Sequence, residues 1–348
     1  MDLDLGIYIK YQLDGSLFDL CCLTAKSKTT ERLILEALFA DDCALMAHQE
    51  NHLQTIVDRF STATKLFGLT INLSKTEVLY QPAPGRPTNQ PCITINSTQL
   101  SNVNTFKYLG STIANDGSLD HEINARIQKA SQALRRLLSK VLQHRDVSTA
   151  TKLKVYNAVV LSSLLYDCET RTLYRKHMKQ LEQFHQRSLQ SIIRIRWQDR
   201  ITNQEVLDRA NSTSIEVTQL QWSGHVICMD PQRIPRQVFY GDLSAGLRKQ
   251  GRPMKRFKDQ LKSNLKWAGI TPKQLELAAS DRSSWRTHIH HATTTFEDER
   301  RRCLAAAHEH RHHATPAPPV TTGVPCPMCH RLCASAFGLQ SHMRVHRR

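Results

Sequence analysis

Four residues near the C-terminal end of the sequence constrain its folding more than any other feature. Cys326, Cys329, His342 and His346 follow the spacing Cys-x2-Cys-x12-His-x3-His. Two thiolates three residues apart fit one turn, and two imidazoles four residues apart lie on one face of a helix, so the four donors can surround a Zn²⁺ ion tetrahedrally. A segment this short buries too little apolar surface to fold alone, so its folding should depend on the metal. The spacing predicts a small ββα zinc finger over residues 326–348.

The other side chains of this segment predict how it meets a polyanion. Leu339 is the apolar helix residue that such a finger needs, Cys333 stands where an aromatic residue is usual, and Phe337 is expected to fill that space. The base-reading positions of the helix carry small residues, namely Ser335, Gly338 and Ser341. Four arginines are expected to hold phosphates, namely Arg331, Arg344, Arg347 and Arg348. Backbone tethering is therefore favoured over sequence reading; a protein-binding finger and a chance spacing of Cys and His are the alternatives.

Positive charge is concentrated in the last third of the chain. Residues 1–230 hold 26 basic and 23 acidic side chains, whereas residues 231–348 hold 21 basic and 8 acidic ones. A concentrated positive field attracts phosphate backbones, so RNA or DNA is the expected partner, with an acidic protein or simple solubility as the alternative. Six cations ahead of the finger are expected to contact phosphates, namely Arg252, Lys255, Arg256, Lys258, Lys262 and Lys266.

Apolar periodicity and composition divide the 348 residues into five regions. Residues 1–117 alternate between strand and helix patterns, residues 118–230 carry the long apolar stripes of a helical bundle, and residues 231–313 predict basic helices. Residues 314–325 form a Pro/Thr-rich linker, and residues 326–348 form the finger. The fold class is therefore predicted to be α+β. Ser148 or Thr149 is expected to cap a helix that runs to Leu165, Gly269 to end a later helix, and Thr271-Pro272 to begin the next. Within the helices, Trp222 and Trp267 are expected to lie in the core.

Two adjacent carboxylates mark the first region. Asp41 and Asp42 stand between the apolar runs Leu33–Leu38 and Cys43–Ala47, which predicts a hairpin with both carboxylates at its tip. A helix should begin at Glu50 and end at Gly68, followed by a strand over residues 69–73 and further strands over residues 92–95 and 105–113. Taken alone, an Asp-Asp pair at a turn is ordinary turn chemistry. In a nucleotidyl transferase such a pair binds Mg²⁺.

Further segments give the pair a context. Phe39–Asp42 is followed by a helix, then by Gly68–Glu77, then by Phe106–Gly110, a helical bundle and the finger. This ordered series resembles the C-terminal portion of the reverse transcriptases of LINE-type (non-LTR) retrotransposons, and the resemblance covers most of the chain. The pair of residues Trp285-Arg286, which follows Asp281, is also similar to the tail of such proteins.

The resemblance implies a partial reverse-transcriptase palm, a helical thumb-like region, a basic helical region and the finger. It implies that Asp41 and Asp42 are the metal-binding pair of RNA-directed DNA synthesis, with Mg²⁺ as the ion. It places Lys75 near the phosphates of the incoming nucleotide. It makes residues 106–110 the primer-grip hairpin, in which Lys107 and Tyr108 would contact nucleic acid; packing of Tyr108 within a strand is the alternative.

One departure from this family bears on activity. The family carries a first palm aspartate well upstream of the pair, and none of Asp2, Asp4, Asp14 and Asp19 stands in such a context. Two-metal chemistry needs ligands from both strands. We therefore expect a vestigial metal pair in a truncated, inactive relative. The alternatives are a non-enzymatic zinc-finger protein that binds or regulates DNA, and an inert product that does not fold stably.

Nothing in the sequence predicts export or a membrane span. No basic segment precedes an apolar one near Met1, and the longest apolar stretch, residues 155–166, contains Asn157, Ser162 and Ser163. The expected location is intracellular, nuclear or cytoplasmic, and the ten cysteines are expected to be thiols or metal ligands. The His-rich stretch over residues 288–313 favours a solvated basic helix, with a second metal site as the alternative.

Overall fold

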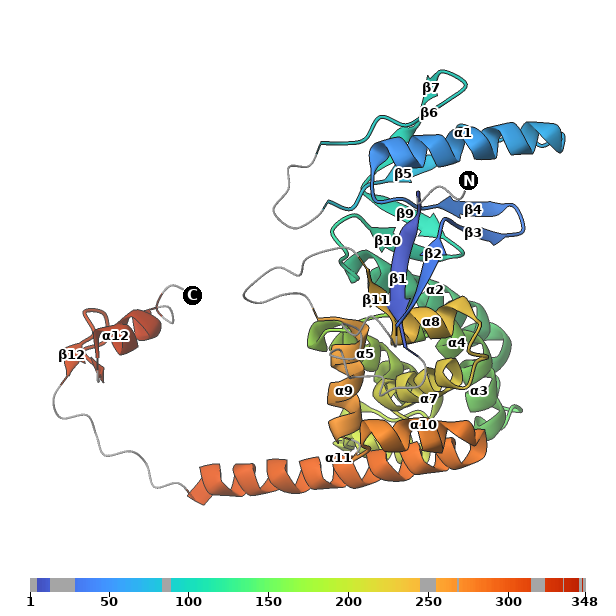
Figure 1. Ribbon diagram of the computed structural model, residues 1–348. Coiled ribbons are helices and arrows are strands. Elements are labelled where there is room, and N and C mark those ends of the chain that lie inside the picture. The colour runs from blue at the N-terminus through green and yellow to red at the C-terminus, as the bar shows by residue number, and fades with distance from the viewer. Residues whose placement is uncertain are drawn as a thin grey trace. The chain divides into compact units, whose positions relative to one another are not determined.

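The computed structural model of the chain describes residues 5–12, 29–82, 89–244, 255–267, 269–313, 323–333, 335–343 and 346. These residues form a mixed α+β structure, as the apolar patterns predicted. The chain divides into two compact units, Met1–Thr294 and Thr295–Arg348. Figure 1 shows their helices and strands. Each unit is described separately.

A helical bundle forms the first core of the larger unit. Its helices are α2 (Asp120–Leu137), α3 (Thr149–Val155), α4 (Ser162–Leu164), α5 (Arg175–Ile192) and α6 (Asn203–Arg209), with π-helical turns at Leu138–Leu142 and Tyr156–Leu161. The predicted cap of α3 is confirmed, because the Ser148 side chain accepts a hydrogen bond from the Thr151 amide. Ile123, Tyr156 and Leu189 lie fully buried where the helices meet.

A second core lies among the helices that follow. It is built by α7 (Ile215–Ile227), α8 (Ile234–Tyr240), α9 (Phe257–Trp267), α10 (Pro272–Ser280) and the beginning of α11 (Arg282–His313). Thr271 caps α10 through a capping box with Gln274, and Gly269 ends the preceding segment with a φ of +67°, as the sequence predicted. Trp285 is buried in this core, whereas Trp222 is 43% exposed, so the prediction of a core position for Trp222 is wrong. The Trp267 side chain lies outside the described residues.

One small sheet joins distant parts of the chain. Strand β1 (Ile7–Tyr11) pairs antiparallel with β2 (Thr30–Ile34) on one side and with β11 (Asp242–Leu243) on the other, as Figure 1 shows. Arg32 on β2 donates to the Gln237 side chain of α8 at 2.6 Å. The region predicted as the first of the chain therefore shares a sheet and side-chain contacts with the region predicted as basic helices.

The predicted carboxylate hairpin is formed by β3 (Glu36–Phe39) and β4 (Asp42–Leu45). Helix α1 (Glu50–Leu66) follows, and Gly68, two residues beyond its last residue, has a φ of +71°, as expected of the glycine predicted to stop this helix. Strands β5 (Glu77–Leu79) and β8 (Ser101–Val103) pair in parallel, and β6 (Thr94–Ile95) and β7 (Thr98–Gln99) form a short hairpin. Strands β9 (Thr105–Tyr108) and β10 (Ser111–Ala114) form another hairpin. Val57, Ile93 and Ile95 are buried among these elements.

The predicted strand over residues 69–73 is wrong. No described strand pairs with this segment, and residues 73–75 form a turn in which the Lys75 and Thr76 amides both donate to the Asn72 carbonyl. Leu69 is 63% exposed. Alternation of apolar and polar residues needs a neighbouring strand to become a ladder, and this segment has none.

The smaller unit contains the end of α11, β12 (Val324–Pro325), β13 (Leu332–Cys333) and α12 (Ala336–Met343). Val324 pairs with Cys333 and Pro325 with Leu332, so these two residues belong to a strand and not to the predicted linker. Residues 314–322 of that linker lie outside the described residues. Phe337 is 81% exposed, so the prediction that its ring fills the core of this segment is wrong.

None of the helices in the described part of the chain combines the length and the apolar character needed to cross a membrane.

Candidate metal centre and nucleic-acid contacts

The four predicted metal ligands converge in the smaller unit. Cys326 and Cys329 come from the turn between β12 and β13, His342 comes from α12, and His346 follows it. Their donor atoms all lie within 4.8 Å of one another. Cys329 Sγ lies 3.1 Å from His342 Nε2, and Cys326 Sγ lies 3.6 Å from His346 Nε2. We call these four residues the Cys/His cluster.

The local fold supports the cysteine side of the cluster. The Cys326 amide donates to the Arg331 carbonyl and the His330 amide donates to the Cys326 carbonyl, which closes the turn that holds both thiols on one side. Burial raises the pKa of the Cys326 thiol, but hydrogen bonds from the Met328 and Cys329 backbone amides and from the Cys329 thiol outweigh it and lower that pKa. Thiolate is the form that binds metal ions, so the turn favours metal binding.

The donor set fits a metal ion. With metal–sulfur and metal–nitrogen distances of about 2.3 and 2.0–2.1 Å, a tetrahedral site separates its donors by roughly 3.3–3.8 Å. The observed separations of 3.1 Å between the His342 and His346 Nε2 atoms and 3.6 Å between Cys326 and His346 are close to that range. The Cys/His cluster could therefore hold a metal ion.

The surface around the cluster offers few groups that read bases. The Ser335 hydroxyl accepts a hydrogen bond from the Gly338 amide at 3.1 Å, so it caps α12. Arg331 is exposed beside the thiol turn. Three of the predicted phosphate ligands, Arg344, Arg347 and Arg348, and the side chain of Ser341 lie outside the described residues.

The carboxylate pair lies at an exposed hairpin. Ala40 takes a left-handed conformation with a φ of +51°, and Phe39 pairs with Asp42 directly below the turn. Asp41 and Asp42 are both exposed. The Tyr108 hydroxyl, from β9, donates to the Ala37 carbonyl at 2.9 Å and so joins this hairpin to the β9–β10 hairpin. Burial, followed by the Asp42 and Cys43 charges, raises the pKa of the Tyr108 hydroxyl, which keeps it a donor.

The described residues do not complete a magnesium site around this pair. Among them, the Cys/His cluster is the one group of three or more acidic, Cys or His side chains whose donors meet. Lys75 is exposed after α1, and in the described part of the chain it forms no ion pair with Asp41 or Asp42. The His-rich stretch likewise brings no donor group together among its described side chains.

A buried ion network holds the β9–β10 hairpin against the bundle. Glu122 Oε1 accepts from Arg126 Nε at 2.6 Å and from Arg171 Nη2 at 2.8 Å, and all three side chains are nearly fully buried. Glu122 Oε2 accepts from the Thr112 amide of β10 at 2.6 Å, and Arg126 donates to the Gly110 carbonyl in the turn. Lys129 donates to the same carbonyl.

Sequence reasoning missed this network. The spacing of Glu122 and Arg126 is that of an ordinary exposed helix pair, and a signal was available only in their nearness to the apolar stripe that carries Ile123. Arg171 lies 49 residues from Glu122 in the chain, so no local pattern joins them.

The basic residues in and just before α9 that were predicted to contact phosphates are either exposed or engaged by the protein itself. Lys255, Lys262 and Lys266 are exposed. Lys258 corrects the prediction, because its ammonium is buried and donates to the Tyr240 carbonyl at 2.7 Å, and burial lowers its pKa to about 8. Arg256 pairs with Asp242 at 2.6 Å. Lys107 on β9 is exposed, and Arg252 lies outside the described residues.

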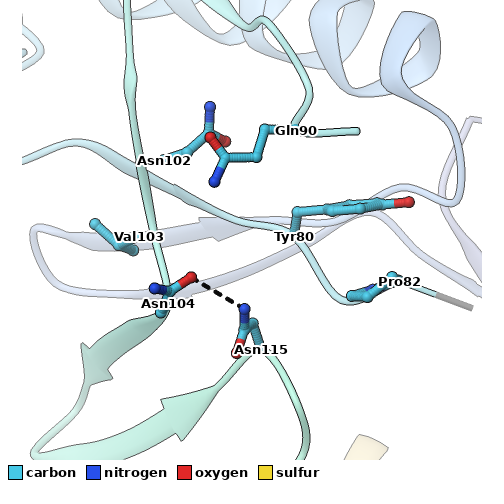
Figure 2. Close-up of a pocket in the computed structure, with 7 residues that line it drawn as sticks. All are labelled: Tyr80, Pro82, Gln90, Asn102, Val103, Asn104 and Asn115. Atoms are coloured by element: carbon cyan, nitrogen blue, oxygen red, sulfur yellow. Dashed lines mark hydrogen bonds between the residues drawn. The ribbon is translucent and has the colours of Figure 1, made fainter. Parts of the chain in front are cut away.

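A polar cavity of about 250 Å³ lies beside β8 and β10 (Figure 2). Its lining includes Tyr80, Gln90 and Asn102, and the Asn115 side chain donates to the Asn104 side chain at 3.1 Å. The Tyr80 phenol is the one titratable group among the residues that line it. The described lining of the cavity therefore offers neither a carboxylate or imidazole to act as a general base nor a set of metal ligands.

The chain matches no protein-family model, and neither curated proteins nor solved structures provide a match.

Proposed function

We propose that this protein binds zinc and nucleic acid, and that it is related to the C-terminal part of LINE-type reverse transcriptases. In this proposal the Cys/His cluster holds Zn²⁺ and residues 323–346 form a Cys2His2 finger. The observation that carries the proposal is the convergence of four Cys and His donors within 4.8 Å. Two thiolates and two imidazoles in a tetrahedral set are the ligands that Zn²⁺ prefers.

Exposed cations support a phosphate-binding role. Lys255, Lys262 and Lys266 reach solvent from α9 and its start, and Arg331 does so beside the thiol turn. Flexible ammonium groups bind phosphates as point charges and carry little base information. RNA or DNA would therefore be held by its backbone, and the protein would act inside the cell, in the nucleus or the cytoplasm.

The order of elements in this chain is the one that the sequence resemblance implies. A carboxylate hairpin, a helix, a further hairpin and a helical bundle follow one another along it. For the polymerase reaction, Asp41 and Asp42 would be the ligands of Mg²⁺, the ion that would polarise the reacting phosphate. With no third carboxylate beside them in the described residues, we propose that this chain alone does not extend a primer.

Two measurements on the purified full chain test the proposal. Titration with a chromophoric zinc chelator should give one tightly held Zn²⁺ per chain. Fluorescence anisotropy with a labelled RNA or DNA strand should show log K falling linearly with log salt, by about 0.7–0.9 for each phosphate contacted. Absence of zinc uptake, or an affinity that does not change with salt, would contradict the proposal.

Matched variants locate the contact. Replacing Lys262 and Lys266 by Gln should make the salt dependence shallower by roughly 2 phosphate contacts. The same change at Lys140 and Lys154, which are exposed on the bundle, should leave the salt dependence unchanged.

Primer-extension assays with Mg²⁺ should show no nucleotide incorporation by the wild type or by Asp41→Ala. Incorporation by the wild type that Asp41→Ala loses would show that the chain is an active polymerase.

A second candidate function is a sequence-specific DNA regulator. The Ser335 hydroxyl counts against it, because this hydroxyl caps α12 when it should be free to read a base. Enrichment of one duplex from a random pool would favour the regulator over backbone binding.

A further inference from the structure

A second cavity lies in the larger unit, where α7 meets the end of α10 and the beginning of α11. Its volume is about 220 Å³, and its lining includes Trp222, Gly224, His225, Trp285 and Arg286. This is smaller than the roughly 300–1,000 Å³ of sites for drug-sized ligands. The space suits a single planar ring system.

One side of the cavity is formed by Trp285, whose ring needs a glycine beside it in α7. Trp285 packs against Gly224 of α7 so closely that a Cβ at position 224 would lie 2.0 Å from Trp285 Nε1. Trp285 is 2% exposed, and no described residue accepts a hydrogen bond from its indole N–H.

The rim of the cavity carries an aromatic surface. Trp222 is exposed although it belongs to a helix of an otherwise buried core, and it contacts His225 edge to face with the ring centroids 5.9 Å apart. This contact orients the indole without stacking the two rings on each other. Exposed indoles beside a cavity are effective platforms for bases, because every base has a π face.

The charge around the cavity suits a phosphate. Arg286 lines the cavity and is exposed. Asp281, which directly precedes α11, accepts hydrogen bonds from the Ser283 and Ser284 hydroxyls. Among the described residues no carboxylate forms an ion pair with Arg286, and this cation lies in the part of the chain that carries most of the net positive charge.

We propose that this cavity takes one unpaired base of a single-stranded nucleic acid, with Trp222 stacking on the base and Arg286 holding a neighbouring phosphate. The inference rests on the proposed nucleic-acid binding and names where a base, as opposed to the backbone, is recognised. A duplex keeps its bases stacked and would not enter.

The test compares the affinities of the full chain for two labelled nucleic-acid strands, measured by fluorescence anisotropy at low ionic strength. One is a short single strand with bases, and the other is an abasic strand of the same length and charge. Trp222→Ala should weaken binding of the strand with bases by about 5- to 150-fold and leave binding of the abasic strand unchanged. Trp222→Phe should recover most of the loss, since a phenyl ring can still stack.

Two further variants separate base from phosphate. Arg286→Gln should weaken binding of both strands by the same factor. Leu277→Ala removes an exposed apolar side chain of α10 that does not line the cavity, and it should change neither affinity. Trp222 is partly exposed, so its truncation leaves the core in place, and thermal unfolding of the variant checks this directly.

The outcomes distinguish the inference from the function on which it rests. If the wild type binds both strands equally, or if Trp222→Ala keeps the preference for bases, the cavity is not a base site and polyanion binding stands. If the wild type binds neither strand, both proposals are wrong. A preference for bases that disappears only in Trp222→Ala supports the inference.

Discussion

The Cys/His cluster and the carboxylate hairpin are two sites of the same chain for which the sequence predicted a metal, and they differ in how their donors come together. In the cluster, all four donors come from a segment of 21 residues and meet within 4.8 Å. In the hairpin, Asp41 and Asp42 are exposed beside each other and no third donor joins them in the described residues.

The difference shows which sites a local segment can build. A turn and one helix suffice to orient two thiols and two imidazoles, so nearby residues complete the cluster. A carboxylate site for two metal ions needs strands from distant parts of the chain, and the hairpin depends on what surrounds it. One described support is the hydrogen bond from the Tyr108 hydroxyl, and Tyr108 belongs to a hairpin that the buried Glu122 holds.

The largest expected effect concerns the cluster. Cys329→Ser should abolish tight zinc binding and unfold residues 323–346, because structural zinc contributes an apparent free energy of about 10–16 kcal/mol to such segments. Zinc titration and amide hydrogen exchange of the full chain measure both effects. Cys333→Ser is the matched control, since this thiol lies outside the donor set and should leave zinc affinity unchanged.

The next effect tests whether the carboxylate hairpin depends on the bundle. Glu122→Gln leaves Arg126 and Arg171 buried without their counter-charge, so the free energy of unfolding should fall by about 3–5 kcal/mol. Urea denaturation followed by circular dichroism measures it. Glu205→Gln removes the carboxylate of an exposed pair with Arg209 and should cost no more than about 1 kcal/mol. Equal losses in the two variants would show that the buried network adds nothing.

Local signals predicted where helices begin and end, but not which of their side chains are buried. Ser148, Thr271 and Gly269 cap or end segments as expected, because caps and left-handed glycines depend on neighbours in the sequence. Lys258 and Trp222 were misplaced because burial depends on what packs against a helix, which its own sequence does not contain.

The candidate sites follow the same division. The spacing of the four Cys/His donors could be found in the sequence because one segment contains them all. The base-sized cavity could not, since it exists only where α7, α10 and α11 meet. The strand predicted over residues 69–73 failed for the related reason that no strand in the described part of the chain pairs with it.

A third prediction concerns protons in the bundle, away from both metal sites. His185 is fully buried between the Tyr156 hydroxyl at 2.9 Å and the Ser212 hydroxyl at 3.3 Å, and burial lowers its pKa below the ordinary 6.5 although the Glu182 charge opposes this. In the unfolded chain His185 binds a proton near pH 6.5, and in the folded chain it does so only at lower pH. The contribution of the neutral His185 to the free energy of unfolding is therefore fully present above about pH 6.5 and is lost as the pH falls below it.

Thermal unfolding between pH 5 and 8 measures this loss. His185→Gln should flatten the decline below pH about 6.5. His121→Gln, which changes an exposed imidazole of α2, should keep the wild-type slope. The same slope in His185→Gln and the wild type would assign the decline to other groups.

The smallest effect tests the hydrogen bond between the two hairpins. Tyr108→Phe removes the hydrogen bond to the Ala37 carbonyl and should lower the free energy of unfolding by about 0.5–1.5 kcal/mol, with faster amide exchange in β3 and β4. Tyr166→Phe removes a comparable bond to the Leu109 carbonyl in the turn that follows β9. It should leave exchange at the Asp41 turn unchanged, and a change there would mean that the two hairpins move as one.

The pairing of β1 with β11 has a consequence for how the protein is made. Ile9 lies opposite Leu243, so the edge of β1 that pairs with β11 must wait until about 230 further residues have been synthesised and have left the ribosome. During that interval β1 can pair with β2 alone, and its other edge is open to strands of neighbouring nascent chains. Slow translation between these two points should therefore lower the yield of native protein more than slow translation within the bundle.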